Sequence, residues 1–218
     1  TLDYYLEELE EVRKKLGLDN FYLVGHSWGG LLAQEYALKY GEHLKGLVVF
    51  SMIDNIEEYT THINKLREEM FNSLEVQYMK DVEETENFDD PMYQELLKKL
   101  YAKYVTRHPK VSHMVNTMAT DVYNYFQGNN EFVMVGTLNG WSVRDKLANV
   151  KVPTLLTFGE FDTMPLDVAR RMQDTLPNSR LVLTPDGGHC HNEDNPEAFF
   201  KSLYKFVSEV EDGTFGKE

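Results

Sequence analysis

Residues 21–30, with the sequence FYLVGHSWGG, run from a short apolar segment into a glycine-rich turn. The segment Phe21 to Val24 is typical of a strand buried on both faces of a parallel sheet. A serine at the turn from such a strand into a helix is held in a strained backbone that presents its hydroxyl above the sheet. We therefore expect Ser27 to be a nucleophile, with the backbone N–H of Trp28 donating to an oxyanion.

On either side of this turn, the apolar residues alternate between helical spacing and short continuous runs. Strands are predicted at 21–24, 47–50, 152–158 and 181–183, and helices at 2–16, 31–40, 169–176 and from Pro196 onward. The last helix is expected to start after the cap residue Asn195, to bury Phe199, Phe200, Leu203, Phe206 and Val207, and to end in a frayed tail at 211–218. Strands that alternate with helices predict an α/β fold with a parallel sheet covered on both faces.

About a hundred residues between the second and third strands show no strand pattern. Helical stretches there include 56–71 and 93–104, and the block is far longer than a crossover between parallel strands needs. We interpret it as an inserted helical lid at 53–142, between core segments at 1–52 and 143–218. Residues 53–95 hold 13 acidic and 3 basic residues, and residues 52–134 hold seven of the nine methionines. The lid thus either has a solvated acidic surface over a Met-lined core or forms a negatively charged cover over a pocket that favours a cationic ligand.

A serine needs a base to take its proton and an acid to orient that base. In this architecture the acid and then the histidine follow the serine along the chain. Asp162 comes directly after the third strand and His189 directly after the fourth. Because the carboxyl ends of parallel strands lie at the same edge of a sheet, Ser27, Asp162 and His189 are predicted to form a catalytic triad.

Other candidates fit this role less well. Glu160 lies too close to the end of the third strand to be the acid of the triad, and Asp167 is expected inside the next helix. The His-x-His spacing of His189 and His191 suggests a metal, but three or four convergent ligands are needed and no others are placed for it, so neither a metal nor a cofactor is expected. Cys190 is expected to be a small packed side chain and not a nucleophile. His26 is interpreted as structural.

Composition limits the class of protein. The 218 residues carry a net charge of −14, which argues against a protein that binds nucleic-acid phosphates. No apolar run approaches the roughly 20 residues that cross a bilayer, so no membrane association is expected. A single cysteine cannot form an internal disulfide, which favours the cytoplasm as the location.

Together these motifs resemble the α/β-hydrolases of the proline iminopeptidase type, and more closely the tricorn-interacting aminopeptidase branch. The resemblance covers nearly the whole chain and is strongest at 25–30, 130–137, 152–156, 159–162 and 188–189. It implies a Ser-His-Asp triad at Ser27, His189 and Asp162. It also implies that Glu131, in the motif Asn-Glu-Phe, holds the free amino terminus of the substrate. A buried ammonium favours a carboxylate partner, which agrees with that role.

Two departures from the family stand out. A second amine-binding glutamate often follows the catalytic aspartate, whereas this chain has Thr163. The family also has strands and a His-Gly-Gly-Pro-Gly type loop ahead of the helix at which this chain begins, and that loop supplies the second oxyanion donor. Losing one such donor costs about 100- to 1000-fold in turnover. We therefore expect this chain to be the C-terminal part of an α/β-hydrolase fold, in which the strand that leads to Ser27 has an open edge. We expect a separate N-terminal polypeptide to complete the fold.

The sequence predicts a serine hydrolase that releases N-terminal residues, with a preference for proline, from small peptides. Two alternatives stay open: an amino-acid amidase or esterase with the same mechanism, and an inactive fragment or binding protein on a hydrolase scaffold. The aromatic residues Trp28, Phe132, Tyr78 and Trp141 either shape a pocket for an apolar side chain or pack within the lid.

Overall fold

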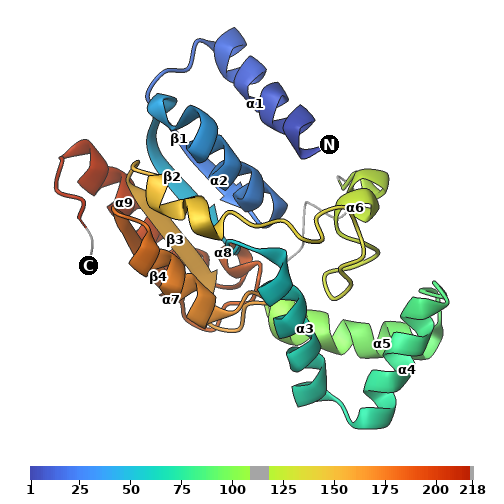
Figure 1. Ribbon diagram of the computed structural model, residues 1–218. Coiled ribbons are helices and arrows are strands. Elements are labelled where there is room, and N and C mark those ends of the chain that lie inside the picture. The colour runs from blue at the N-terminus through green and yellow to red at the C-terminus, as the bar shows by residue number, and fades with distance from the viewer. Residues whose placement is uncertain (109–117, 217–218) are drawn as a thin grey trace.

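The structure is a computed structural model that describes residues 1–108 and 118–216. Its core is a four-stranded sheet in the order β1-β2-β3-β4, in which all neighbours are parallel (Figure 1). The strands are β1 (Phe21–His26), β2 (Leu44–Phe50), β3 (Thr154–Gly159) and β4 (Ser179–Thr184). The α/β class and the parallel sheet predicted from the sequence are confirmed. Within the described residues β1 pairs only with β2, so the strand that leads to Ser27 has the open edge that was expected.

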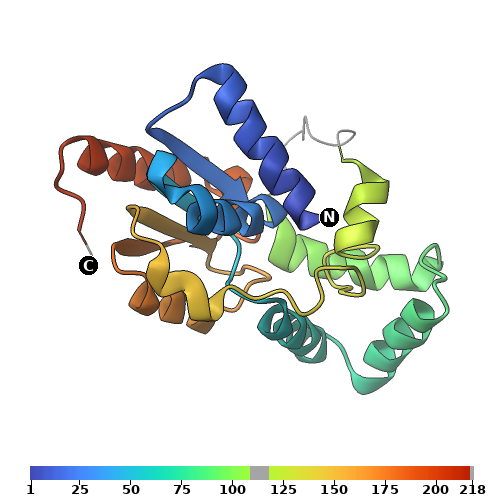
Figure 2. The same ribbon diagram turned by 45° about the horizontal axis from the view of Figure 1, so that its top comes forward.

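Helices cover both faces of this sheet (Figure 2). One face packs against α2 (Trp28–Tyr40) and α7 (Leu166–Thr175), and the other against α9 (Pro196–Glu211). The two faces follow from the alternation of side chains along a strand. In β2, Val49 belongs to the core beneath α2, while Val48 packs with Phe206 of α9.

The N-terminal helix α1 (Leu2–Leu16) ends at Gly17, which has the left-handed φ of 63°. Its apolar spacing predicted the helix correctly: Leu6 is part of the core, and α1 also makes polar contacts. Glu10 is buried, accepts a hydrogen bond from Tyr36 of α2 at 2.7 Å and pairs with Arg13 at 2.8 Å. Leu16 is exposed.

Between β2 and β3 the described residues form helices. They are α3 (Ile56–Met70), α4 (Ser73–Glu84), α5 (Pro91–Leu100), a π-helical turn (Tyr101–Val105), α6 (Thr120–Phe126) and a 3-10 helix (Arg144–Asn149). An isolated antiparallel bridge joins Asn55 to Ser142, near the two ends of the segment predicted as a lid. The interpretation of residues 53–142 as an inserted lid remains a prediction.

Two expectations about the C-terminal region are wrong. Phe200 is exposed, because it lies outside the face of α9 that Phe199 and Phe206 bury. Of the tail predicted at 211–218, residues 212–216 also fold back onto α9 instead of fraying, while 217 and 218 lie outside the described residues. Phe215 stacks edge-on against Phe206, with ring centroids 5.0 Å apart, and its N–H donates to Glu209.

A 3-10 turn at Gly41–His43 and a short α-helix, α8, at His191–Asp194 complete the fold. Across residues 1–108 and 118–216, no helix is both long and apolar enough to cross a membrane.

Candidate active site

Ser27 lies in the turn between β1 and α2 with φ 52° and ψ −119°, which is a strained backbone for a residue other than glycine. Its N–H donates to the carbonyl of Phe50 at 2.9 Å. The turn requires glycine at position 25, because a Cβ there would lie 2.1 Å from the carbonyl oxygen of Gly29. Trp28 is the first residue of α2, so its N–H has no acceptor within the helix. The tight turn therefore fixes the serine at the carboxyl edge of the sheet.

Asp162 and His189 follow β3 and β4 at the same edge of the sheet. The Nδ1 of His189 lies 2.9 Å from Oδ1 of Asp162, and both side chains are buried. The backbone N–H groups of Gly159 and Met164 also donate to the Asp162 carboxylate, at 3.2 and 3.1 Å. These donors hold the carboxylate so that it can orient the imidazole.

The two groups shift each other's titration. Burial alone would raise the pKa of Asp162, but its attraction to His189 and the hydrogen bond between them leave that pKa lowered. Burial alone would lower the pKa of His189, but the Asp162 carboxylate raises it above its usual value. The other ring nitrogen of His189, Nε2, is buried and has no hydrogen-bond partner among the described residues. Nε2 is thus the atom that can take up a proton.

The loop that carries His189 is fixed by the inserted helices. The N–H groups of His189 and Cys190 donate to the carbonyls of Tyr104 and Val105, each at 2.8 Å. This close backbone approach explains the glycine at position 188, since a Cβ there would lie 2.8 Å from both carbonyl oxygens.

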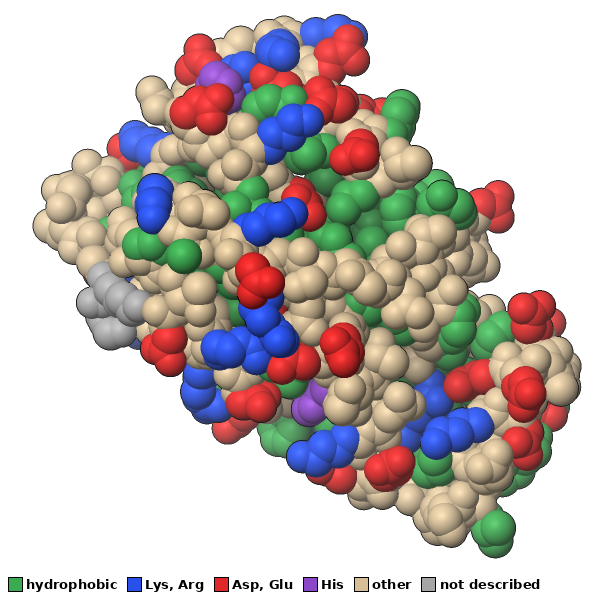
Figure 3. Space-filling view, in the orientation of Figure 1, with side chains coloured by type: hydrophobic (Ala, Val, Ile, Leu, Met, Phe, Trp, Pro, Cys, Tyr) green, Lys and Arg blue, Asp and Glu red, His purple; other side chains and the backbone are tan. Residues whose placement is uncertain are grey.

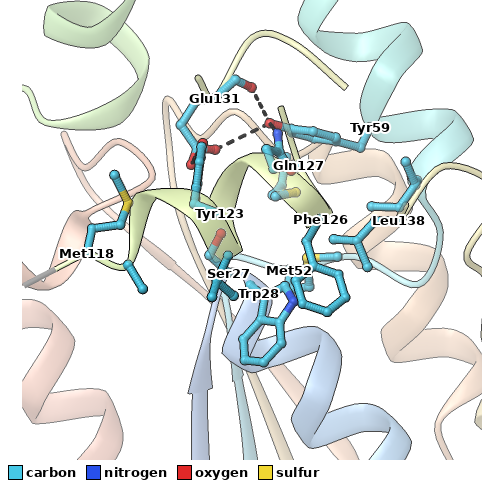
Figure 4. A pocket seen from close by; sticks show the side chains of 14 residues that line it. Ser27, Trp28, Met52, Tyr59, Met118, Tyr123, Phe126, Gln127, Glu131 and Leu138 are labelled. Atoms are coloured by element: carbon cyan, nitrogen blue, oxygen red, sulfur yellow. Dashed lines mark hydrogen bonds between the residues drawn. The ribbon is translucent and has the colours of Figure 1, made fainter. Parts of the chain in front are cut away.

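A cavity of about 210 Å³ opens above Ser27. Its apolar lining includes Trp28, Met52, Ile56, Met118, Ala119, Val122, Phe126, Leu138 and Met164. Its polar lining consists of Ser27, Tyr59, Tyr123, Gln127 and Glu131. Ser27 lies at one end of this cavity and Glu131 at the other (Figure 4). Figure 3 shows apolar side chains gathered between α1 and α6 on this face of the molecule.

Two tyrosine hydroxyls hold Glu131 in place. Tyr123 donates to Oε1 of its carboxylate at 3.0 Å. Tyr59 donates to the backbone carbonyl of Glu131, and its hydroxyl also lies 3.3 Å from Oε2. Burial, followed by the nearby Glu131 charge, raises the pKa of both tyrosines well above the usual value, so both hydroxyls keep their protons. The N–H of Glu131 donates to the hydroxyl of Tyr101 at 3.0 Å. Glu131 is thus a fixed anionic group in an otherwise mostly apolar cavity.

Residues 1–196 match the family described as the alpha/beta hydrolase fold. The chain belongs to the α/β-hydrolase family. It is 30% identical to the proline iminopeptidase of Flavobacterium johnsoniae, over 97% of this chain and 74% of the relative. It is 31% identical to the proline iminopeptidase of Saccharolobus solfataricus, over 96% and 69%. Within the α/β-hydrolases, this places the chain in the proline iminopeptidase family.

Solved structures agree with this fold. The proline iminopeptidase of Mycobacterium smegmatis superposes with a TM-score of 0.85 at 26% identity, covering 98% of this chain and 73% of the other. VinJ superposes with a TM-score of 0.89 at 24% identity, over 96% and 73%, which supports the shared fold alone.

Two hydroxyls of this hydrolase that contact the Asp162–His189 pair were missed in the sequence. Ser51, at the end of β2, lies 2.6 Å through its Oγ from Oδ2 of Asp162. Thr163 lies 3.1 Å through its Oγ1 from Nδ1 of His189. Thr163 thus contacts the histidine of the pair. The signal available for Ser51 was its place directly after a predicted strand.

Trp28 is the only one of the four aromatic residues proposed for the pocket that lines the cavity. Tyr78 donates to Asp90 at 2.5 Å, and Trp141 donates to Glu35 at 2.8 Å. Phe132 is buried against Tyr101. These three aromatic residues pack or bond elsewhere, and Tyr59, Tyr123 and Phe126 contribute the other rings of the cavity.

His26 and His191, the histidines next in sequence to Ser27 and His189, both make contacts within the protein. Burial lowers the pKa of His26 to about 3, and its Nε2 lies 3.1 Å from the carbonyl of His189, in agreement with a structural role. His191 bonds through both ring nitrogens, to Ser51 and Thr157. In the part of the chain that is described, no three His, Cys, Asp or Glu side chains are grouped to hold a metal ion. Burial raises the pKa of the Cys190 thiol to about 12, which disfavours a nucleophilic role at neutral pH.

Proposed function

We propose that this chain is a serine hydrolase that releases N-terminal residues, with a preference for proline, from small peptides or amino-acid amides. The observation that carries the proposal is that Ser27 and Glu131 line the same cavity. The buried pair of Asp162 and His189 lies at the same edge of the sheet as Ser27, although Nε2 of His189 makes no hydrogen bond to Ser27 or to any other described residue. A hydroxyl nucleophile and a fixed carboxylate at opposite ends of one cavity suit a substrate that has a free amine close to its scissile carbonyl.

In the proposed reaction, Ser27 Oγ attacks the carbonyl carbon while Nε2 of His189 takes the hydroxyl proton. The Asp162 carboxylate keeps the Nδ1–H of His189 in place and stabilises the imidazolium that forms. The N–H of Trp28 donates to the oxyanion of the tetrahedral intermediate. His189 then gives its proton to the leaving amine, and water hydrolyses the acyl-serine through the same base.

Substrate preference follows from the lining of the cavity. Glu131 pairs with the ammonium of the substrate, since an ammonium in a mostly apolar cavity needs a carboxylate partner. The apolar walls, among them Trp28, Phe126 and Leu138, accommodate the side chain of the N-terminal residue. A blocked amine loses the ion pair and leaves the partly buried Glu131 without that partner.

The experiment compares a prolyl anilide with its N-acetylated counterpart. The proposal predicts turnover of the free-amine substrate and little turnover of the acetylated one. Equal turnover of both, or preferential hydrolysis of neutral esters, would favour the esterase alternative. No turnover of either substrate by a folded protein would favour a binding protein.

The separate N-terminal polypeptide remains part of the proposal. It would pair with β1, which has one neighbour among the described strands, and would supply the second oxyanion donor. Intact mass spectrometry of the purified protein under denaturing conditions tests this. A second species of roughly 70–90 residues alongside the 25.4 kDa chain supports it, and a single species with full activity contradicts it.

A further inference from the structure

A chain of buried polar groups runs from the Asp162 carboxylate away from the cavity. Ser51 Oγ lies 2.6 Å from Oδ2 of Asp162 and 3.2 Å from Nδ1 of His191. Nε2 of His191 lies 3.0 Å from Oγ1 of Thr157 on β3. The side chains of Ser51, His191 and Thr157 are all buried, with exposed fractions of 0%. None of these three residues has a part in the reaction proposed above.

The direction of each hydrogen bond follows from counting protons. Ser51 has one hydroxyl proton and three candidate acceptors: Asp162 Oδ2 at 2.6 Å, the His189 carbonyl at 2.9 Å and, in one tautomer of His191, Nδ1 at 3.2 Å. The carboxylate contact is the shortest one and has the length of a hydroxyl bonded to an anion. The Ser51 proton therefore lies toward Asp162.

The tautomer of His191 is then fixed. Burial lowers the pKa of His191 to about 4, so near neutral pH the ring has a single N–H. Since the Ser51 proton is committed to Asp162, the contact of 3.2 Å requires Nδ1–H to donate to Ser51 Oγ. Nε2 is then an acceptor, and the hydroxyl of Thr157 donates to it at 3.0 Å. Every donor in the chain points toward Asp162.

We propose that Thr157, His191 and Ser51 are positioning residues that act in series to hold the carboxylate of Asp162 ionised and oriented toward His189. Hydrogen bonds that share one direction polarise one another, so each hydroxyl or ring strengthens the next donor. The role in catalysis rests on the proposed function, whereas the direction of the donors does not.

Other titratable groups also face this pair. Those around His189 and Asp162, besides His191, are His26 on β1, His62 on α3, Cys190 and Glu131. They stay unchanged in the variants below, so a change in the titration of His189 reports on the donor chain.

The test measures the pKa of His189 by NMR titration of histidine labelled with 15N, in the full chain. Ser51→Ala removes one donor from the Asp162 carboxylate, which leaves more negative charge for His189. We expect the pKa of His189 to rise by about half a unit to one unit. We expect kcat for the prolyl anilide to fall about three- to tenfold, the rate equivalent of one hydrogen bond.

Thr157→Val removes the proton that keeps Nε2 of His191 an acceptor. Both tautomers of His191 then become populated, and the Nε2–H form takes the Ser51 proton away from Asp162. We expect a smaller rise in the His189 pKa, which Thr157→Ser reverses. In a Ser51→Ala background, Thr157→Val should cause no further change in the pKa of His189, because the coupling runs through Ser51.

Thr154→Val is the matched control. Thr154 lies on the same strand and is equally buried, but its hydroxyl donates to the carbonyl of Val152 at 2.9 Å. It should leave the His189 titration unchanged. Equal shifts for Thr154→Val and Thr157→Val would overturn the proposal, as would an unprotonated Nδ1 on His191 in the 15N spectrum of the parent. If the parent hydrolyses no substrate, the proposed function fails, but the titration still decides the direction of the donors.

Discussion

The Nδ1–H of His189 points to Oδ1 of Asp162 across 2.9 Å, between two side chains that are both buried. This geometry makes the carboxylate a fixed partner for the imidazole. Asp162→Asn replaces the charge with an amide of the same shape, which stabilises the wrong tautomer of His189. We expect kcat for a prolyl anilide to fall by about 10⁴-fold while binding changes little. A variant with near-parental kcat would show that Asp162 does not orient the base.

The raised pKa of His189 predicts the acid side of the pH–rate profile. His189 must be neutral to take the proton from Ser27, so activity falls when the ring becomes protonated. Because the Asp162 carboxylate raises that pKa, the acid limb of kcat/KM should have its midpoint above the usual histidine value of 6.5. A midpoint below that value would contradict the account.

The same pair predicts how stability depends on pH. The raised pKa of His189 contributes stability that is fully present below the pKa of the unfolded chain and is lost as pH rises through the folded pKa. The lowered pKa of Asp162 contributes stability that is lost as pH falls through its folded value. Urea unfolding across the pH range in the parent and in Asp162→Asn checks this. The variant should lose the Asp162 dependence, and the His189 dependence should change sign, because burial alone lowers the pKa of His189.

Glu131→Gln tests the recognition of the amine. The variant keeps the shape and its contacts with the hydroxyls of Tyr59 and Tyr123, but it loses the charge. We expect kcat/KM for a free-amine anilide to fall by about 100-fold, consistent with the loss of a buried charge pair. Hydrolysis of a neutral ester should be nearly unchanged. Equal losses on both substrates would mean that Glu131 only supports the fold.

Arg67 links the helices of the insertion to the segment that carries Glu131. It is buried, pairs with Glu83 at 2.8 Å and donates to the carbonyl of Phe132, the residue after Glu131. Arg67→Met removes the cationic partner of the partly buried Glu83 carboxylate, which keeps the hydrogen bond from the Tyr93 hydroxyl at 2.9 Å. We expect a loss of about 3 kcal/mol in the free energy of unfolding, measured with urea. Lys65→Met is the matched control, because its pair with Glu69 is exposed and should contribute little.

Much of the fold and the triad candidates could be predicted because their signals are local. The turn around Ser27 has a recognisable sequence, and Asp162 and His189 directly follow predicted strands. The Asp162–His189 contact then follows from the parallel order of β3 and β4.

The supporting residues could not be predicted, because their contacts join distant segments through common residue types. Ser51 contacts Asp162, which is 111 residues away in the sequence, and His191, which is 140 residues away. Nothing in the neighbourhood of Tyr59 marked it as a partner of Glu131, 72 residues away. The exposure of Phe200 and the return of Phe215 onto Phe206 likewise depend on how α9 lies against the sheet.

The central claim is that Ser27 carries out hydrolysis, and the rate of release of the anilide from prolyl anilide by the purified protein tests it most directly. The account predicts turnover by the parent that falls to the background rate in Ser27→Ala, with the folded state of the variant preserved. Turnover that persists undiminished in Ser27→Ala would contradict the account, because the reaction would then proceed without the proposed nucleophile.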